Sequence, residues 1–378
     1  MYRLSGAQSR LFFGIAIVLS VSLALGRAMQ PVSASPHAVS FGVNMHPLQD
    51  TYAAYSPSQT LGLASEIGAS IVRIDIHWGW IEYSGPGTAS WDQSQLRRLD
   101  TFLAEASRRH IQLLATVLDT PCWASTEPDK RCPPGPPRYY ENYPPANPRD
   151  FANFLTTLIR HVGQKIQYYE IWNEPNLTKT WVQPDPVAYT QLLKAAYRAI
   201  KAQDPGAQVL AGATSGADTN FVNRMYEAGA KGYFDALSIH PYSGNRSPGT
   251  CSTPGASFRC GVERVRQIML RHGDTRPLWL TELGESVSAG AGPSAQARYV
   301  AQAFSLTRRW SYVRGAVWYE LYDDPTGHDG EHFGLFQRTL CPRPAARSFR
   351  SSVLPTIAAS ALKCPRSDSA MLSVARVR

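Results

Sequence analysis

The sequence predicts a single α/β domain folded as a (β/α)8 TIM barrel, and three observations support this. Eight short apolar runs rich in β-branched residues alternate with amphipathic stretches from residue 40 onward. The chain has 378 residues, of which 43% are hydrophobic, and such a length is ordinary for a barrel built as one domain. No G-x-G-x-x-G or Walker motif interrupts the pattern, which disfavours a nucleotide-binding sheet.

The apolar runs are the expected strands, and each is followed by a helical pattern or a long loop. A closed parallel barrel explains this order more readily than an open sheet does. In the stretch 92–110, Leu96, Leu99, Leu103 and Ala106 recur at helical spacing on one face. The expected strands are 40–44, 71–76, 111–117, 166–171, 208–211, 234–239, 278–281 and 313–318. The expected helices include 92–110, 148–162, 186–202, 220–230, 262–272 and 295–310.

Three unusually long connections, 119–147, 241–261 and 321–340, all follow expected strands. In a barrel of this kind, the loops after the strands form the catalytic face. The first loop is rich in proline and carries four aromatic residues, Trp123, Tyr139, Tyr140 and Tyr143. This composition suits a stiff wall with exposed rings, and we expect it to line an open groove.

The two ends of the chain differ from its middle. Arg3 and Arg10 precede the apolar run 11–26, and small residues follow up to Ala34. This pattern indicates a signal peptide cleaved near Ala34 and hence an extracytoplasmic protein, with an uncleaved membrane anchor as the alternative. We therefore expect a signal peptide over 1–34, a catalytic barrel over 35–340 and a basic C-terminal helix or tail over 341–378.

The six cysteines fall as three sequence-local pairs, which favours disulfides in an exported chain. The expected pairs are Cys122–Cys132, Cys251–Cys260 and Cys341–Cys364. Zinc binding is the competing interpretation, but the chain has no C-x-x-C pair and no histidine-rich partner segment.

The net charge of +9 is concentrated at the ends of the chain. Residues 1–27 contribute +3 and residues 338–378 contribute +7, which leaves −1 for the rest. A near-neutral body argues against nucleic acid as an obligatory partner, and the basic tail either holds the protein near anionic surfaces or keeps it soluble. We expect a monomer with no nucleic-acid partner and no obligatory membrane partner.

Two glutamates follow expected strands, and they are the candidate catalytic groups. Glu174 ends the run Tyr169-Glu170-Ile171-Trp172-Asn173-Glu174 after the fourth strand, and Glu282 ends Leu278-Trp279-Leu280-Thr281-Glu282 after the seventh. Both positions face the mouth of the predicted barrel. Glycosidic cleavage needs two such carboxyl groups, one to protonate the leaving oxygen and one to attack or to activate water.

The order and spacing of these motifs resemble the retaining glycoside hydrolases of clan A, which include family 5 cellulases and family 39 xylosidases. The run 41–46, the run 169–176 and the run Phe333-Gly334-Leu335-Phe336 look most like family 39, particularly its bacterial members that cleave exopolysaccharides. Family 5 is the second match. The resemblance spans about residues 40–340 and implies a β-linked carbohydrate substrate with no cofactor and no metal.

The resemblance also implies a role for each matching residue. Glu174 is expected to be the catalytic acid/base and Glu282 the nucleophile. The other expected substrate-binding or supporting residues are Asn173 for the sugar 2-hydroxyl, Arg73 and Tyr242 beside the nucleophile, His240, Trp318 under the sugar, Trp123 and His46. Arg73 and Tyr242 are expected to favour charge on Glu282, and this charge to raise the pKa of Glu174.

Several alternatives stay open. Arg73 could serve a structural ion pair, His240 could be a satisfied core histidine, and the tryptophans could be ordinary packing. His77, His328 and His332 fit no metal-ligand motif. A barrel that binds polysaccharide without cleaving it, or a transglycosylase with the same residues, would also fit. The sequence does not specify the sugar, its linkage, or whether cleavage is internal; the stiff aromatic loop favours internal cleavage.

Overall fold

The computed structural model describes residues 39–365 except 53, 127–141, 245, 252–257, 290–291, 326–331 and 356–360. In this part of the chain, parallel strands close into a barrel in sequence order, with the last strand beside the first. The strands are β1 (Ser40–Met45), β2 (Ile71–His77), β3 (Gln112–Leu118), β4 (Tyr168–Ile171), β5 (Gln208–Ser215), β6 (Ala236–His240), β7 (Leu278–Leu283) and β8 (Val313–Trp318). The predicted (β/α)8 barrel is thereby confirmed.

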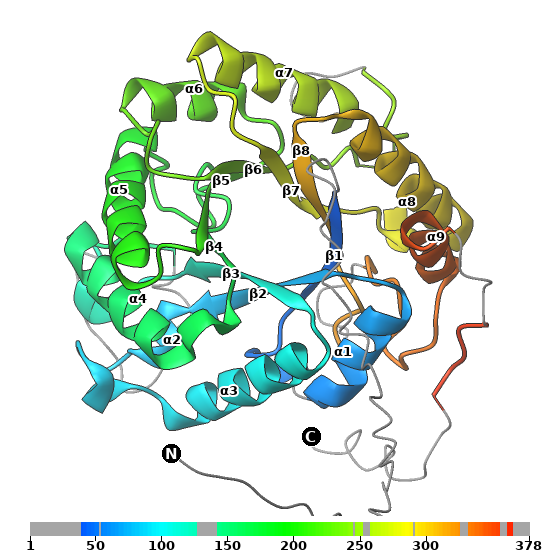
Figure 1. Ribbon diagram of the computed structural model, residues 1–378, viewed down its shortest axis with the longest axis horizontal. Coiled ribbons are helices and arrows are strands. Elements are labelled where there is room, and N and C mark those ends of the chain that lie inside the picture. Colours follow the sequence, from blue (N-terminus) through cyan, green and yellow to red (C-terminus); the bar gives the residue numbers. More distant parts are fainter. Residues whose placement is uncertain are drawn as a thin grey trace, which may run out of the picture. The chain divides into compact units, whose positions relative to one another are not determined.

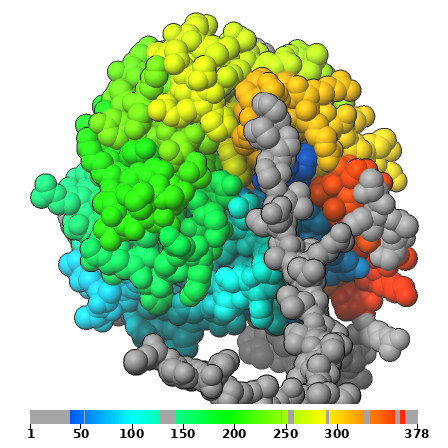
Figure 2. All heavy atoms as spheres, viewed as in Figure 1, coloured from blue at the N-terminus to red at the C-terminus, as the bar shows by residue number. Residues whose placement is uncertain are grey.

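Helices surround the strands, and the longer ones from α3 to α8 follow one another around the barrel in chain order (Figure 1). The α-helices are α1 (Pro57–Glu66), α2 (Trp78–Ile81), α3 (Gln93–Arg108), α4 (Pro148–Val162), α5 (Pro186–Gln203), α6 (Thr219–Glu227), α7 (Phe258–Arg271), α8 (Gly292–Arg309) and α9 (Pro344–Val353). Figure 2 shows the same succession on the surface, where the colours pass from cyan through green and yellow to orange. Neighbouring helices such as α4 and α5 pack directly on each other.

Local signals in the sequence explain where the helices begin. Helices α4 and α5 each start with a proline preceded by a capping side chain. Asn147 accepts a hydrogen bond from the backbone of Arg149 at 3.0 Å, and Asp185 accepts one from Val187 at 2.8 Å. Such caps satisfy backbone donors that the first helical turn leaves unpaired.

The end of the barrel where the strands begin is filled by a small apolar cluster around Trp279. Trp279 packs against Tyr168 with ring centroids 4.7 Å apart. The β8 residue beside it is Gly315, where a Cβ atom would lie 2.0 Å from the Trp279 ring. Because this end is packed with apolar side chains, polar groups that face a cavity lie at the opposite end, where the strands finish.

The observed element boundaries differ from the expected ones by a few residues. Strand β5 continues to Ser215 instead of ending at Ala211, and its register with β6 shifts between Ala211 and Thr214. Gly212 and Ala213 both have positive φ angles at this irregularity, with values of 107° and 41°. A strand predicted from regular alternation of side chains is therefore ended too early at such an irregularity. Helices α1 and α2 were not delimited from the sequence.

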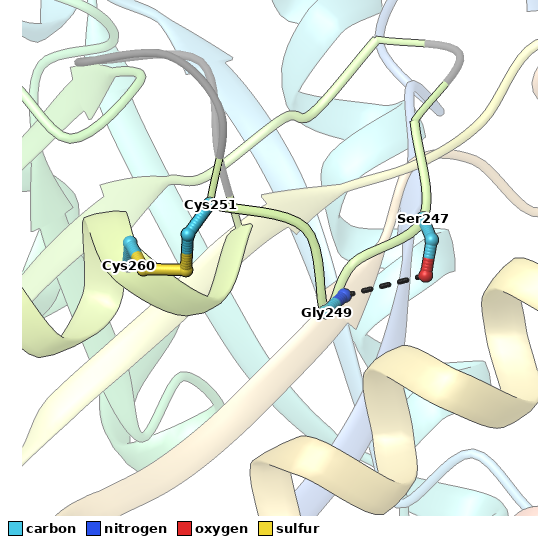
Figure 3. Close-up of a disulfide and its surroundings, with 4 residues drawn as sticks. All are labelled: Ser247, Gly249, Cys251 and Cys260. Atoms are coloured by element: carbon cyan, nitrogen blue, oxygen red, sulfur yellow. Dashed lines mark hydrogen bonds between the residues drawn. A yellow bond between two sulfur atoms is a disulfide. The ribbon is translucent and has the colours of Figure 1, made fainter.

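Two of the three predicted disulfides are confirmed, Cys251–Cys260 and Cys341–Cys364. Figure 3 shows the first, which ties the connection before α7 to the first turn of that helix. In the same connection, the backbone N–H of Gly249 donates to Ser247 Oγ at 3.4 Å. Cys132, the predicted partner of Cys122, lies outside the described residues, as do Tyr139, Tyr140 and His328.

The predicted signal peptide over 1–34 also lies outside the described residues, and the domain boundaries stay a prediction. Within the described residues, no helix is both long enough and apolar enough to cross a membrane. Helix α9, in the predicted basic C-terminal segment, packs on α8.

Candidate active site

The ends of the strands surround a cavity of about 790 Å3. Glu174, three residues beyond β4, and Glu282, near the end of β7, both line it and are 6% and 8% exposed. The described residues that line it are His46, Gln49, Asp75, His77, Leu118, Asn173, Glu174, Lys179, Ser215, Tyr242, Gly244, Glu282, Gly284, Glu285, Ser286, Ser288, Tyr319 and Phe333. The expected convergence of both glutamates on one cavity is therefore present in the structure.

Glu282 is held by two hydrogen-bond donors that reach different carboxylate oxygens. Arg73 Nη1 donates to Oε1 at 2.8 Å, and the hydroxyl of Tyr242 donates to Oε2 at 3.0 Å. Burial, followed by the charge of Glu282, raises the pKa of Tyr242 well above its ordinary value, so this hydroxyl keeps its proton. Two donors on one carboxylate fix its orientation.

Arg73 connects this carboxylate to the floor of the site. Its fully buried guanidinium donates at 2.8 Å to Glu170, Asn44 and Asn173 as well as to Glu282. Burial alone raises the pKa of Glu170, but Arg73 reverses the shift and lowers it. Because Asn173 accepts from Arg73 through Oδ1, its amide nitrogen is oriented for donation elsewhere.

Glu174 contacts His240 at the end of β6. His240 Nδ1 lies 3.2 Å from Glu174 Oε1 and 3.5 Å from Glu282 Oε2, and its ring is fully buried. Burial alone raises the pKa of Glu174, but the His240 contact outweighs it and lowers the pKa to about 2, with Lys179 adding to the effect. The expected rise in the pKa of Glu174 is therefore absent, because His240 lies between the two carboxylates. Burial lowers the pKa of His240, and the two carboxylates overcome this and raise it.

One oxygen of Glu174, one oxygen of Glu282 and one nitrogen of His240 lie within 4.8 Å of one another. In the described part of the chain, this is the group of side chains close enough to share a metal ion. The Arg73 guanidinium already neutralises Glu282 at 2.8 Å and would repel a second cation. The arrangement instead suits two carboxyl groups that act on one bond and share a proton through an imidazole.

The opposite side of the cavity carries two histidine–aspartate pairs. His46 Nδ1 lies 2.6 Å from Asp75, and His77 Nδ1 lies 2.5 Å from Asp119. The contact with His46 overcomes the effect of burial and lowers the pKa of Asp75. For Asp119 the effect of burial is larger than that of the His77 contact, and the pKa is raised. The ring of Trp80 stacks on His77 with centroids 3.8 Å apart, so this wall is rigid.

Two of the expected sugar-binding rings lie elsewhere. Trp318 is fully buried, and its indole nitrogen donates to the carbonyl of Phe333 at 3.0 Å. Trp123 is half-buried, donates to the carbonyl of Glu82 at 2.8 Å and lines a separate cavity of about 270 Å3. Neither ring lines the main cavity, because each is committed to packing against its own neighbours. Among the described residues, the tyrosine and phenylalanine rings that line the main cavity are those of Tyr242, Tyr319 and Phe333.

The structure brings the other predicted residues together, with His46, Asn173 and Tyr242 in the lining and Arg73 and His240 beneath it. It also adds lining residues that were not predicted as site residues. Asp75 and His77 alternate with Arg73 along β2, and this polar period of two in an apolar strand was a usable signal. Lys179, Tyr319 and Glu285 lie in connections and carried no such signal.

Comparison with known proteins agrees with this geometry. The family model described as Cellulase (glycosyl hydrolase family 5) matches residues 32–313. A similar solved structure is a family 39 glycoside hydrolase from the gut symbiont Bacteroides cellulosilyticus WH2, with TM-score 0.67 and 23% identity over 85% of this chain and 64% of that one. The GH39 enzyme from Xanthomonas axonopodis pv. citri gives TM-score 0.60 and 20% identity over 84% and 66%.

The GH39 β-xylosidase from Caulobacter crescentus gives TM-score 0.58 and 19% identity over 84% of this chain and 71% of that one. At these identities the likeness concerns the fold, and the chain spans less than two thirds of the first two proteins, at 64% and 66% of their lengths. The expectation of a clan A glycoside hydrolase is confirmed. Because the family model matches most of its length, the chain belongs to the cellulase family, glycosyl hydrolase family 5.

Proposed function

We propose that the protein is a retaining glycoside hydrolase of β-linked polysaccharides or oligosaccharides, with Glu174 as acid/base and Glu282 as nucleophile. One observation carries the proposal: an oxygen of each carboxyl group lies within 4.8 Å of the other. Retaining enzymes hold these groups about 5–5.5 Å apart, whereas inverting enzymes need about 6.5–9.5 Å to admit a water molecule. The short separation therefore favours direct attack by a carboxylate.

The reaction then has two steps. In the first, Glu174 gives its proton to the glycosidic oxygen, the bond from that oxygen to the anomeric carbon breaks, and a Glu282 oxygen bonds to the carbon. In the second, Glu174, now a carboxylate, takes a proton from water, whose oxygen attacks the same carbon and releases Glu282. Two inversions at one carbon give net retention of configuration.

His240 supplies a store for the proton that the first step needs. In the protein alone, its contact lowers the pKa of Glu174 to about 2, so the shared proton resides on the imidazole. A bound glycosidic oxygen accepts a hydrogen bond from the protonated carboxyl group of Glu174, and the substrate also displaces water from that group. Both effects raise the pKa of Glu174, so the proton moves to it. The proton moves along the 3.2 Å contact between His240 Nδ1 and Glu174 Oε1.

A panel of β-linked polysaccharides, with products read by mass spectrometry and NMR, tests this function. The first product should retain its anomeric configuration. Glu282→Gln should abolish turnover, because an amide is not a nucleophile. Glu174→Ala should keep activity on substrates whose leaving group needs no proton, and added azide should increase that activity. Glu66→Gln, an exposed change on α1, is the matched control. An inverted first product contradicts the assignment of Glu282.

We further propose that cleavage is internal. The support is the length of the connections after β6 and β8, which carry the lining residues Tyr242, Tyr319 and Phe333. Aromatic faces on long loops suit several consecutive sugar units. Products of mixed length should therefore appear at the first time point. Release of monosaccharide alone from the start would show attack at chain ends.

We also propose that the protein works outside the cytoplasm as a monomer. The disulfides Cys251–Cys260 and Cys341–Cys364 support the location, because such bonds persist mainly in oxidising compartments. Cell fractionation with antibodies should find the protein beyond the inner membrane, and light scattering should give one chain per particle. Recovery of the reduced protein from the cytoplasm would contradict the location.

A further inference from the structure

Four carboxyl side chains among the described residues line the main cavity: Asp75, Glu174, Glu282 and Glu285. Three of them contact a basic group, namely His46 at 2.6 Å for Asp75, His240 at 3.2 Å for Glu174 and Arg73 at 2.8 Å for Glu282. Glu285 differs from the others, because no ion pair in the described part of the chain reaches its carboxyl group.

Glu285 is nevertheless buried. The residue is 4% exposed, and its Oε2 atom has no hydrogen-bond partner among the described residues. Arg246 and Arg298 line an adjoining cavity of about 180 Å3 that Glu285 also borders. Burying an unpaired carboxyl group costs free energy, so such a group is retained where a ligand completes its hydrogen bonds.

The backbone around Glu285 is held by close contacts on both sides. At Gly284, a Cβ atom would lie 2.6 Å from the carbonyl oxygen of Tyr319. The carbonyl of Glu285 accepts from Gln296 Nε2 at 3.0 Å. Beyond it, Ser286 Oγ accepts from the backbone of His332 at 3.3 Å. The carboxyl group is thus presented to the cavity on a rigid support.

We propose that Glu285 is a sugar-binding residue that accepts hydrogen bonds from the unit bound over Glu282. The proposal rests on the proposed glycoside hydrolase function. Burial raises the pKa of Glu285 to about 7, so the group is ionised above about pH 7. An ionised carboxylate only accepts hydrogen bonds, so in this pH range its ligand must present donors. Two sugar groups do so: a pair of neighbouring hydroxyls, or the ammonium group of an amino sugar. Bound donors replace the water that burial removes from the carboxyl group.

Titration calorimetry with non-hydrolysing variants tests this binding role. Glu282→Gln provides a background without turnover, and the probes are the β-1,4-linked tetramers of glucose, xylose, mannose and glucosamine. At least one probe should bind this variant, and adding Glu285→Ala should weaken its binding about 10-fold or more, as expected for a lost hydrogen bond to a charged group. Glu285→Gln, which keeps one acceptor, should fall between the two.

The pattern across probes identifies the donor. A loss for the glucose, xylose or mannose tetramer assigns hydroxyl recognition, and a loss confined to the glucosamine tetramer assigns ammonium recognition. Glu66→Gln in the same background removes one exposed negative charge and should change no affinity. Thermal unfolding of each variant checks that it is folded.

Unchanged affinity of Glu285→Ala for every probe that binds, or no millimolar binding of any probe to Glu282→Gln, overturns the proposal. The proposed function fails on a different result: the unmodified protein would hydrolyse none of the β-linked polysaccharides in the panel.

Discussion

Arg73 is the residue on which the floor of the site depends. Its buried guanidinium compensates two carboxylates, Glu170 and Glu282, each at 2.8 Å. We expect Arg73→Met to lower the free energy of unfolding by about 3–5 kcal/mol, because it removes the guanidinium that compensates two buried carboxylates. Arg73→Lys keeps the positive charge but lacks the several N–H donors of the guanidinium, so the free energy of unfolding should fall by less than in Arg73→Met. Urea unfolding measures both, and equal stability of Arg73→Met and the unmodified protein would contradict this account.

Glu285 predicts a pH dependence of stability. Burial raises its pKa from an ordinary 4.5 to about 7, so the folded protein holds a proton that the unfolded chain has lost. The contribution of this group to stability therefore falls as pH rises from about 4.5 to about 7. Glu285→Gln does not titrate, so its stability advantage over the unmodified protein should grow across this window. Urea unfolding at several pH values measures it, and a constant difference would refute the explanation.

At the scale of single residues, the sequence predicted those site residues that stand in an unusual sequence context. Glu174 and Glu282 were found because an acid directly after an apolar strand has few structural explanations. Glu285 was not assigned to the site, because an acid in a connecting segment resembles an ordinary solvated one. What distinguishes it is burial without a partner, and that depends on Gln296 and Tyr319, which are distant in sequence.

Among the elements, the pair β7 and β8 predicts a steric requirement. The Trp279 ring occupies the space that a side chain at Gly315 would need, with a Cβ atom 2.0 Å from it. We expect Gly315→Ala to lower the free energy of unfolding by about 1–3 kcal/mol, since the ring must leave its packed position. Gly249→Ala is the control, because its nearest neighbour would lie 3.9 Å away. Equal urea midpoints for the two variants would contradict the requirement.

Element boundaries followed from periodicity only while the periodicity was regular. Strand β8 has the predicted bounds, Val313–Trp318, and its backbone is regular enough for the run of small and apolar residues after Arg314 to mark it. Strand β5 extends past its predicted end, because Gly212 and Ala213 break the alternation while the chain continues to pair with β6. Backbone pairing is a tertiary property, so no local pattern reveals it.

At the scale of the molecule, the closed barrel was predictable because each strand–helix unit repeats the same pattern and closure follows from the number of units. Of the aromatic lining of the cavity, Tyr242 was predicted, whereas Tyr319 and Phe333 were not assigned to the site. Trp123 and Trp318 are of the residue type that stacks on sugars. Their indole nitrogens, however, donate to the carbonyls of Glu82 and Phe333, which holds both rings away from the cavity lining. Which ring faces the cavity depends on such contacts between distant segments, and these are set only by the assembled fold.

The disulfides predict how the whole molecule responds to reduction. Cys251–Cys260 and Cys341–Cys364 close segments with sequence separations of 9 and 23 residues. On the chain-entropy model, each bridge stabilises the folded protein by about 3 kcal/mol, because it restricts the unfolded chain. Dithiothreitol should therefore lower the urea midpoint of the unmodified protein. The double variant Cys251→Ser/Cys260→Ser should start lower and lose less on reduction. If both proteins unfold at the same urea concentration with and without the reductant, the bridges do not contribute to stability, and the link between this fold and an oxidising compartment loses its physical basis.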